Sequence, residues 1–211
     1  LSYLATAING AIVITGLENM AKDLDLNQSV LSWVQNSYVL AWRCFMLLGG
    51  RLSDAFGRRV ILNLSLLLFG IGSLFAGIAT SATILILSRF IQGVGASILA
   101  PTSLALIMDY FTGEERVKAI AWYSSISGLG MCIGLVMGGT LASFFSWRYG
   151  FFIYLPQFLF STFRLFFIYY NNLHLEPQWF FYISAFISTF LPYFLLYSAV
   201  INAPLPFPAG L

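Results

Sequence analysis

The chain of 211 residues is strongly apolar, with 59% hydrophobic residues, 9% charged residues and a mean hydropathy of +0.85. A soluble domain usually carries about 25% charged residues, so this composition excludes a water-soluble globule and predicts a protein embedded in lipid. The net charge of +2 is small and the basic residues form no run, which excludes a nucleic-acid partner.

Apolar segments of about the length that crosses a bilayer, about 20 residues, follow one another along the chain. Seven are predicted to be transmembrane helices, at residues 2–16, 32–50, 60–80, 83–110, 119–144, 149–170 and 179–201. The first is short, and we expect native sequence before Leu1 to be missing. The pattern predicts an all-α polytopic membrane protein. Residues 1–170 form an N-terminal helix bundle, and residues 171–211 hold a cytoplasmic loop, the seventh helix and a Pro-rich tail.

Basic residues between these segments set the orientation, since short cytoplasmic loops are rich in Lys and Arg. The loop after the second segment holds Arg51, Arg58 and Arg59, and the loop after the fourth holds Arg116 and Lys118. The loops that alternate with them hold one basic residue or none. Both basic loops are therefore predicted to face the cytoplasm, and the compact loops favour a bacterial inner membrane.

The residue types that carry chemistry are scarce. Cys44 and Cys132 lie in apolar segments with no partners at metal-ligand spacing, so we predict that both are small core residues. His174 is predicted to be a polar interface residue in a loop. No predicted span holds a lysine for a Schiff base, a Ser/His pair or an H-E-x-x-H motif. The sequence thus predicts no catalytic residue, metal or cofactor, and argues against a membrane enzyme or a seven-helix receptor.

The loop between the second and third segments, residues 50–59, reads GRLSDAFGRR. It resembles the hallmark G-x-L-x-D-r-x-G-r-r/k loop of the major facilitator superfamily, with alanine at one basic position. Two glycines are expected to permit a tight reversal. The aspartate is expected to pair locally with arginine and to help to cap the third helix. Asp109, at the end of the fourth segment, is expected to reach Arg58. The resemblance implies a cytoplasmic switch that is made and broken as a transporter alternates access, formed by Gly50, Arg51, Leu52, Asp54, Gly57, Arg58, Arg59 and Asp109.

The fourth segment contains a second resemblance, at residues 86–96, to the family pattern l-x-x-R-x-x-q-G-x-g-a. An arginine inside a span costs about 2.5–3.5 kcal/mol on insertion scales, so Arg89 should face a watery cavity or a polar partner. A snorkelling arginine near the outer interface is the alternative. Gln92 follows one turn later on a neighbouring face, and Gly93 comes next. In the family this arginine is tied to proton coupling and substrate movement.

Further features resemble the fourteen-helix drug:proton antiporter branch of that family, over residues 9–156. They are Trp33, Val34, Ser37, Tyr38, Pro101, Ser146, Trp147, Arg148, Phe151 and Pro156. The resemblance implies a six-helix N-terminal bundle of three-plus-three inverted repeats, with one further transmembrane helix. The chain departs from the branch at Asn9, where an aspartate is common, and at Glu18, where a proline is usual.

The fifth segment carries a stripe of glycines at Gly130, Gly134 and Gly138, followed by Gly139. Spacing of four residues puts the first three on one face, suited to close helix contact. Leu135 stands where the branch has proline, so the backbone hydrogen bond is kept and a kink is not expected there. Because the family links that kink with antiport, its absence leaves a role in drug antiport open.

Two charge features bear on the substrate and the coupling ion. Arg43 stands in the second segment where the branch usually has a small residue. It either snorkels towards the cytoplasm or faces the cavity, and in the cavity it would favour an anionic substrate. No acid lies near the middle of a predicted span, so a proton carrier must be Asp109, Glu18 or a residue in missing sequence.

Together these features predict a secondary active transporter of small organic molecules, with proton-coupled drug or metabolite efflux by alternating access. Its coupling and substrate cavity would be built from Arg89, Gln92, Gly93, Asn9 and Arg43. The expected partners are membrane lipid, a small-molecule substrate, protons and missing C-terminal helices that form the other wall of the site. The alternative is a truncated, non-transporting remnant or a partner-binding membrane fragment of such a transporter.

Overall fold

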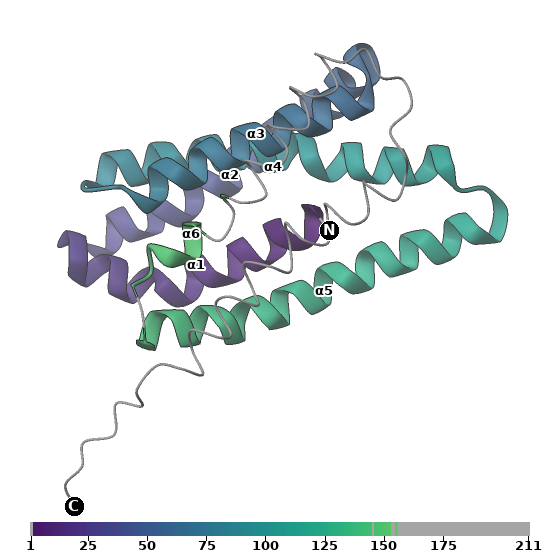
Figure 1. The fold of residues 1–211 in the computed structure, drawn as a ribbon. Coiled ribbons are helices and arrows are strands. Elements are labelled where there is room, and N and C mark those ends of the chain that lie inside the picture. The colour runs from purple at the N-terminus through teal and green to yellow at the C-terminus, as the bar shows by residue number, and fades with distance from the viewer. Residues whose placement is uncertain (1, 145, 153–154, 156–211) are drawn as a thin grey trace, which may run out of the picture.

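The computed structural model describes residues 2–144, 146–152 and 155 (Figure 1). Every regular element in this part of the chain is a helix. The helices are α1 Ser2–Leu24, α2 Gln28–Phe56, α3 Arg58–Gly77, α4 Ala82–Tyr110, α5 Gly113–Phe144 and the short α6 Tyr149–Phe152. The remainder of the predicted sixth segment, the seventh segment and the tail lie outside the described residues.

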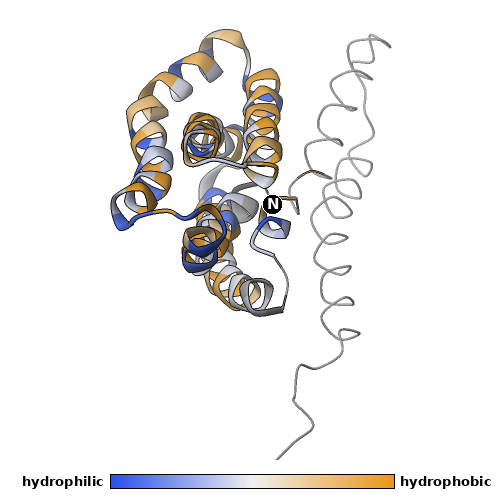
Figure 2. Ribbon diagram, turned by 90° about the vertical axis from the view of Figure 1, so that its left-hand side faces the viewer, coloured by the Kyte–Doolittle hydropathy of each residue, from blue (hydrophilic) through white to orange (hydrophobic). Residues whose placement is uncertain are grey.

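The long helices run side by side as a bundle (Figure 1). The most extensive contacts join α2 and α3 to α4, and α1 to α5. Among the described helices, α3, α4 and residues 113–140 of α5 are long and apolar enough to cross a membrane, judged by length and composition. Hydrophobic residues occur along all the long helices (Figure 2), and many large ones are exposed, such as Leu47 at 85% and Val136 at 69%. An exposed apolar surface of this kind fits lipid as the solvent.

Small residues let α2, α3 and α4 approach closely. A Cβ atom added to Gly93 of α4 would lie 2.8 Å from the Cβ of Ala41 in α2, and one added to Gly95 would lie 2.8 Å from the backbone nitrogen of Phe69 in α3. A Cβ on Gly72 of α3 would lie 2.7 Å from the side chain of Gln92. The backbones therefore meet around the middle of α4, which is the helix that the other two share.

The glycine stripe of α5 lies against α1. Gly130 is buried. A Cβ on Gly134 would lie 2.8 Å from the Cα of Ile8, and one on Gly138 would lie 2.8 Å from the Cα of Ile12. Gly139 has no atom within 4 Å of such a Cβ, so it takes no part in this contact. α5 continues as one helix through Leu135.

The helices extend further than the hydropathy pattern predicted. α1 continues to Leu24, with an ion pair of 3.5 Å between Glu18 and Lys22 on consecutive turns. α2 begins at Gln28, because the side chain of Asn27 accepts a hydrogen bond of 2.9 Å from the backbone nitrogen of Val30. Polar residues that looked like loop thus belong to helix ends that project beyond the apolar spans.

The prediction that Cys44 and Cys132 are core residues is wrong. Both are free thiols on exposed faces of their helices. In a membrane bundle the lipid-facing surface is as apolar as the interior, so an apolar neighbourhood in the sequence does not distinguish the two.

Candidate functional site

The predicted switch loop is a helix junction and contains almost no loop. Residues 50–56 belong to the last turns of α2, and Gly57 alone separates α2 from α3. Gly57 has φ +92°, a conformation that L side chains rarely adopt, so the reversal depends on this glycine. The expectation that Gly50 contributes to the reversal is wrong, since Gly50 is helical. Asp54 was expected to cap α3, which is also wrong, since no side chain caps that helix.

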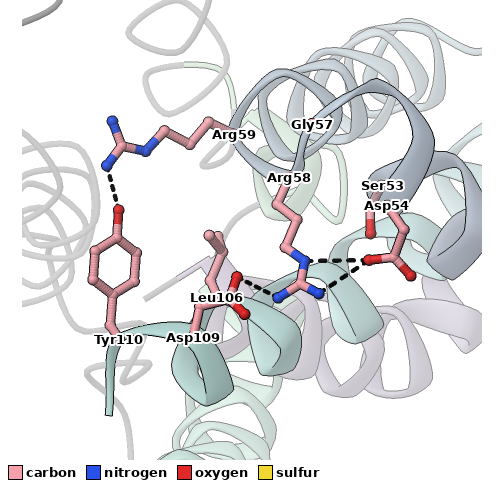
Figure 3. A pocket seen from close by; sticks show the side chains of 8 residues that line it. All are labelled: Ser53, Asp54, Gly57, Arg58, Arg59, Leu106, Asp109 and Tyr110. Carbon is pink, nitrogen blue, oxygen red and sulfur yellow. Dashed lines mark hydrogen bonds and ion pairs between the residues drawn. The ribbon is translucent and has the colours of Figure 1, made fainter.

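Arg58, the first residue of α3, joins three helices at this junction (Figure 3). Its Nε and Nη2 atoms donate to Oδ1 of Asp54 in α2, at 3.2 and 3.1 Å. Its Nη1 atom donates to the carbonyl oxygen of Ala105 in α4 at 2.9 Å and forms an ion pair with Asp109 of the same helix. The side chains of Arg58, Asp54 and Asp109 are 29%, 64% and 54% exposed. Ion pairs this exposed contribute little singly, about 0–1 kcal/mol, so the junction can open without a large penalty.

A surface pocket of about 610 Å³ lies at the junction. Arg59 donates a hydrogen bond to the hydroxyl of Tyr110, at the end of α4 (Figure 3). Leu52 is half-buried and Arg51 is exposed, and neither lines the pocket. The pocket is lined by Ser53, Asp54, Gly57, Arg58, Arg59, Leu106, Asp109 and Tyr110.

A second polar cluster lies inside the bundle, around Arg89 of α4, whose relative exposure is 0%. Its Nη1 atom donates to Oδ1 of Asn9 in α1 at 2.9 Å and to Oε1 of Gln92 at 2.8 Å. Gln92 in turn donates from Nε2 to the hydroxyl of Ser73 in α3 at 2.6 Å. Arg89 is therefore held by polar partners on α1 and α4, is linked to α3 through Gln92, and does not extend to the surface.

The charge of Arg89 is stabilised without a carboxylate among these partners. The guanidinium carbon lies 4.3 Å from the centroid of the Tyr38 ring, a cation–π contact that contributes about 2 kcal/mol when desolvated. The amide of Asn9 accepts from Arg89, which leaves its Nδ2 group buried with no hydrogen-bond partner among the described residues. The cluster thus holds one fixed positive charge bound by neutral groups.

Of the predicted cavity residues, Asn9, Arg89 and Gln92 come together in this cluster. Gly93 lies beside it and is the point where α4 meets Tyr38 and Ala41 of α2. Arg43 does not join them, because it is exposed on another face of α2. Tyr38 and Ser73 complete the cluster, and nothing in the sequence marked Ser73, since small polar residues are common in transmembrane helices.

A third polar cluster connects helices at the end of the bundle opposite the α2–α3 junction. Trp147 is buried, and its Nε1 atom donates to Oδ2 of Asp23, near the end of α1, at 2.8 Å. Arg148 donates to the carbonyl oxygens of Gly77 and Ala79, at 3.0 and 2.7 Å, and lies over the Trp147 ring. These bonds satisfy carbonyl groups at the end of α3. The pair was noted in the sequence as a branch feature only, and its partners were not predicted.

A bundle of membrane-length helices, a buried cation inside it and a charged junction at one end define a multi-pass α-helical membrane protein. A profile of the Major Facilitator Superfamily matches residues 1–179. The chain belongs to the Major Facilitator Superfamily, as the loop and the fourth segment predicted. The family consists of membrane transporters, so the predictions of a multi-pass membrane location and of no enzymatic role are confirmed.

The relatives that match the chain include drug-resistance proteins of bacteria. The chain is 40% identical over 156 residues to the puromycin resistance protein pur8 of Streptomyces alboniger, which covers 74% of this chain and 31% of the relative. It is 33% identical over 178 residues to multidrug resistance protein 3 of Bacillus subtilis, which covers 84% of this chain and 35% of the relative. The chain therefore spans about a third of the length of these relatives.

The fold is similar to a solved structure of a transporter. A crystal structure of the peptide transporter POT matches with a TM-score of 0.59 and 17% sequence identity, over 98% of this chain and 46% of the other. At this identity the likeness concerns the fold alone.

Proposed function

We propose that the chain forms the N-terminal bundle, with one further transmembrane helix, of a secondary active transporter that exports a small organic molecule across a bacterial inner membrane. The proposal includes alternating access and coupling to protons. The observation that carries it is the position of Arg58, which bridges Asp54 of α2 and Asp109 of α4 across the α2–α3 junction. Such a bridge has two states, made and broken, at the end of the bundle that basic residues assign to the cytoplasm.

The physical properties of the bridge support a switch. Its members are partly exposed, so water can replace each partner when the junction opens. Gly57 provides a hinge with almost no connecting chain, so a tilt of α3 relative to α2 moves Arg58 directly. The bridge therefore links the helix positions at the inner end to the charge state of two carboxylates.

The buried cluster supports a role in the transport cycle. Arg89 lies about 10 Å along α4 from its first residue, at 1.5 Å per residue, and connects α1, α3 and α4 through Asn9, Gln92 and Ser73. Relative movement of α1 against α4 must break the bond between Asn9 and Arg89. We assign to this cluster the coupling of movements within the bundle, with the second wall of the substrate site formed by helices outside this chain.

Proton coupling rests on the acids of the chain. Among the described acids, Asp109 is placed to report protonation to the switch, because a neutral Asp109 no longer forms an ion pair with Arg58. Glu18 pairs only with Lys22 on its own helix, and its side chain is 82% exposed. Asp54 also pairs with Arg58, but from four residues away in the sequence, whereas the pair with Asp109 joins α3 to α4. We therefore take Asp109 as the proton carrier in the described part of the chain.

An efflux assay on the open reading frame that encodes the chain tests the proposal. Cells or proteoliposomes are loaded with a panel of small organic molecules that includes puromycin, which one relative is named for resisting, with and without a proton gradient. We expect gradient-dependent export of at least one compound, strongly reduced in Arg89→Ala and Asp54→Asn. Wild-type-like transport by both variants would refute the site assignments. Absence of any flux would favour the alternative of a non-transporting membrane protein.

A further inference from the structure

An arginine lies near the midpoint of α2. Arg43 is separated from either end of this helix by about 20 Å, at 1.5 Å per residue. Its depth is fixed by two close contacts with α4. A Cβ on Gly93 would lie 2.8 Å from Ala41, and one on Gly49 would lie 2.8 Å from the Cα of Ile98. Arg43 is therefore level with the middle of α4, which is long and apolar enough to span the membrane.

The Arg43 side chain points away from the packed core of the bundle. Ala41 is fully buried against α4, and a residue two positions further along is rotated by about 200° around the helix. Arg43 is exposed and forms no hydrogen bond or ion pair with any residue that the structure describes. Arg51, at the cytoplasmic end of the apolar span, lies about 12 Å of helix rise from Arg43, so snorkelling by the Arg43 side chain covers only part of the distance to the membrane surface.

The same face of α2 carries further exposed residues. Asn36 precedes Arg43 by two helical turns, and Leu47 follows it by one. Asn36 is also exposed, and Leu47 is 85% exposed. A guanidinium inside the span, with an amide about 10 Å further along the same face, is costly against lipid tails, whereas a water-filled cavity hydrates both. We name Asn36, Arg43 and Leu47 the Arg43 face.

We propose that the Arg43 face lines the water-filled path of the substrate, and that Arg43 selects molecules that carry an anionic group such as a carboxylate. This inference rests on the proposed transport function. The planar guanidinium donates paired hydrogen bonds to carboxylates and phosphates, and Arg43 has these donors free of described partners. Arg89, a second cation inside the described part of the bundle, is fully buried and bonded to Asn9 and Gln92, so a molecule in the path cannot reach it without movement of the helices.

Cysteine labelling tests the Arg43 face without any need for transport. In a Cys44→Ser, Cys132→Ser background, Leu47→Cys places a thiol one turn from Arg43. Anionic and cationic methanethiosulfonate reagents are compared on the protein in membranes. We expect Leu47→Cys to react, and Leu64→Cys on the exposed side of the apolar α3 to remain unreactive. One turn corresponds to about 6 Å, so adding Arg43→Gln should lower the anionic-to-cationic rate ratio by about tenfold even at the dielectric constant of water.

Transport then tests the selectivity. Wild type, Arg43→Lys and Arg43→Gln are given aryl compounds of equal size that carry a carboxylate, an amide or an amine. We expect Arg43→Gln to lose transport of the carboxylate by about fivefold relative to the neutral amide, the effect of one unit charge about 4 Å from the guanidinium at the dielectric constant of water. Arg43→Lys should retain most of this transport.

The outcomes separate this inference from the proposed function. An unreactive Leu47→Cys, or a rate ratio that Arg43→Gln leaves unchanged, overturns the inference; the second result is expected if a carboxylate elsewhere in the protein neutralises Arg43. Transport whose charge preference is the same in all three proteins overturns the selectivity and leaves the transport function intact. If wild type moves no compound while the labelling ratio changes as expected, the transport function fails and the hydrated, anion-attracting face stands.

Discussion

The contact between α1 and α5 gives the sharpest test of the packing, because two adjacent glycines of α5 differ in their surroundings. A Cβ on Gly138 would lie 2.8 Å from the Cα of Ile12 and would also clash with the hydroxyl of Thr15. The Thr15 side chain can rotate, but the Ile12 backbone cannot move without shifting α1. A Cβ on Gly139 would meet nothing within 4 Å.

Gly138→Ala should therefore destabilise the bundle by about 1–3 kcal/mol, the usual cost of overpacking. Gly139→Ala should be neutral or stabilise the bundle by about 0.5–1 kcal/mol, because alanine loses less backbone conformational entropy than glycine when the helix forms. At about 2–4 °C per kcal/mol, the two variants should melt roughly 2–16 °C apart, with Gly138→Ala the less stable. The assay is heating in detergent followed by size-exclusion chromatography of the remaining monodisperse protein. If both variants melt together, the close approach of α1 and α5 is wrong.

Two further predictions concern the ends of the bundle. Arg58→Gln removes the bridge between Asp54 and Asp109. Spin labels at Ala55→Cys and Thr112→Cys should then show a longer or broader distance distribution. The control Arg51→Gln changes an exposed side chain and should leave the distribution unchanged; equal distributions in both variants would refute the bridge. Trp147→Phe keeps an aromatic side chain but loses the hydrogen bond to Asp23 and part of the buried indole packing, so it should lower the melting temperature by more than the roughly 2–4 °C that correspond to a hydrogen bond of about 1 kcal/mol. In an Asp23→Ala background the same substitution should cost less; an equal cost in both backgrounds would show that the two side chains do not interact.

The sequence predicted the described helices and the family because both depend on local patterns. Apolar runs of membrane length give the number and order of helices, and the spacing of glycines and charges in residues 50–59 identifies the junction. The approach of Asp109 to Arg58 was also anticipated, since alternating orientation brings both to the same membrane side. The predicted helices are shorter than the observed ones, because hydropathy detects only the part of a helix that lies in lipid. The hydrogen-bonded helix continues beyond that part.

Contacts between residues that lie far apart in the chain were harder to predict from the sequence. Arg89 was expected to need a polar partner, but its bond to Asn9 joins residues 80 positions apart, and only the packing of α1 on α4 brings them together. The exposure of Cys44, Cys132 and Arg43 depends on which face of each helix packs. That rotation is weakly encoded when both faces are apolar, so the sequence left the direction of Arg43 open.

The sidedness of the α2–α3 junction tests the account most directly, because the switch requires Arg58 to act at the cytoplasmic end. Ala55→Cys at the junction and Thr80→Cys between α3 and α4 are both exposed, and each is introduced into a background without Cys44 and Cys132. A membrane-impermeant maleimide is applied to intact cells and to inside-out vesicles. We expect Ala55→Cys to react only in the vesicles and Thr80→Cys only in the cells. Reaction of Ala55→Cys in intact cells would contradict this expectation.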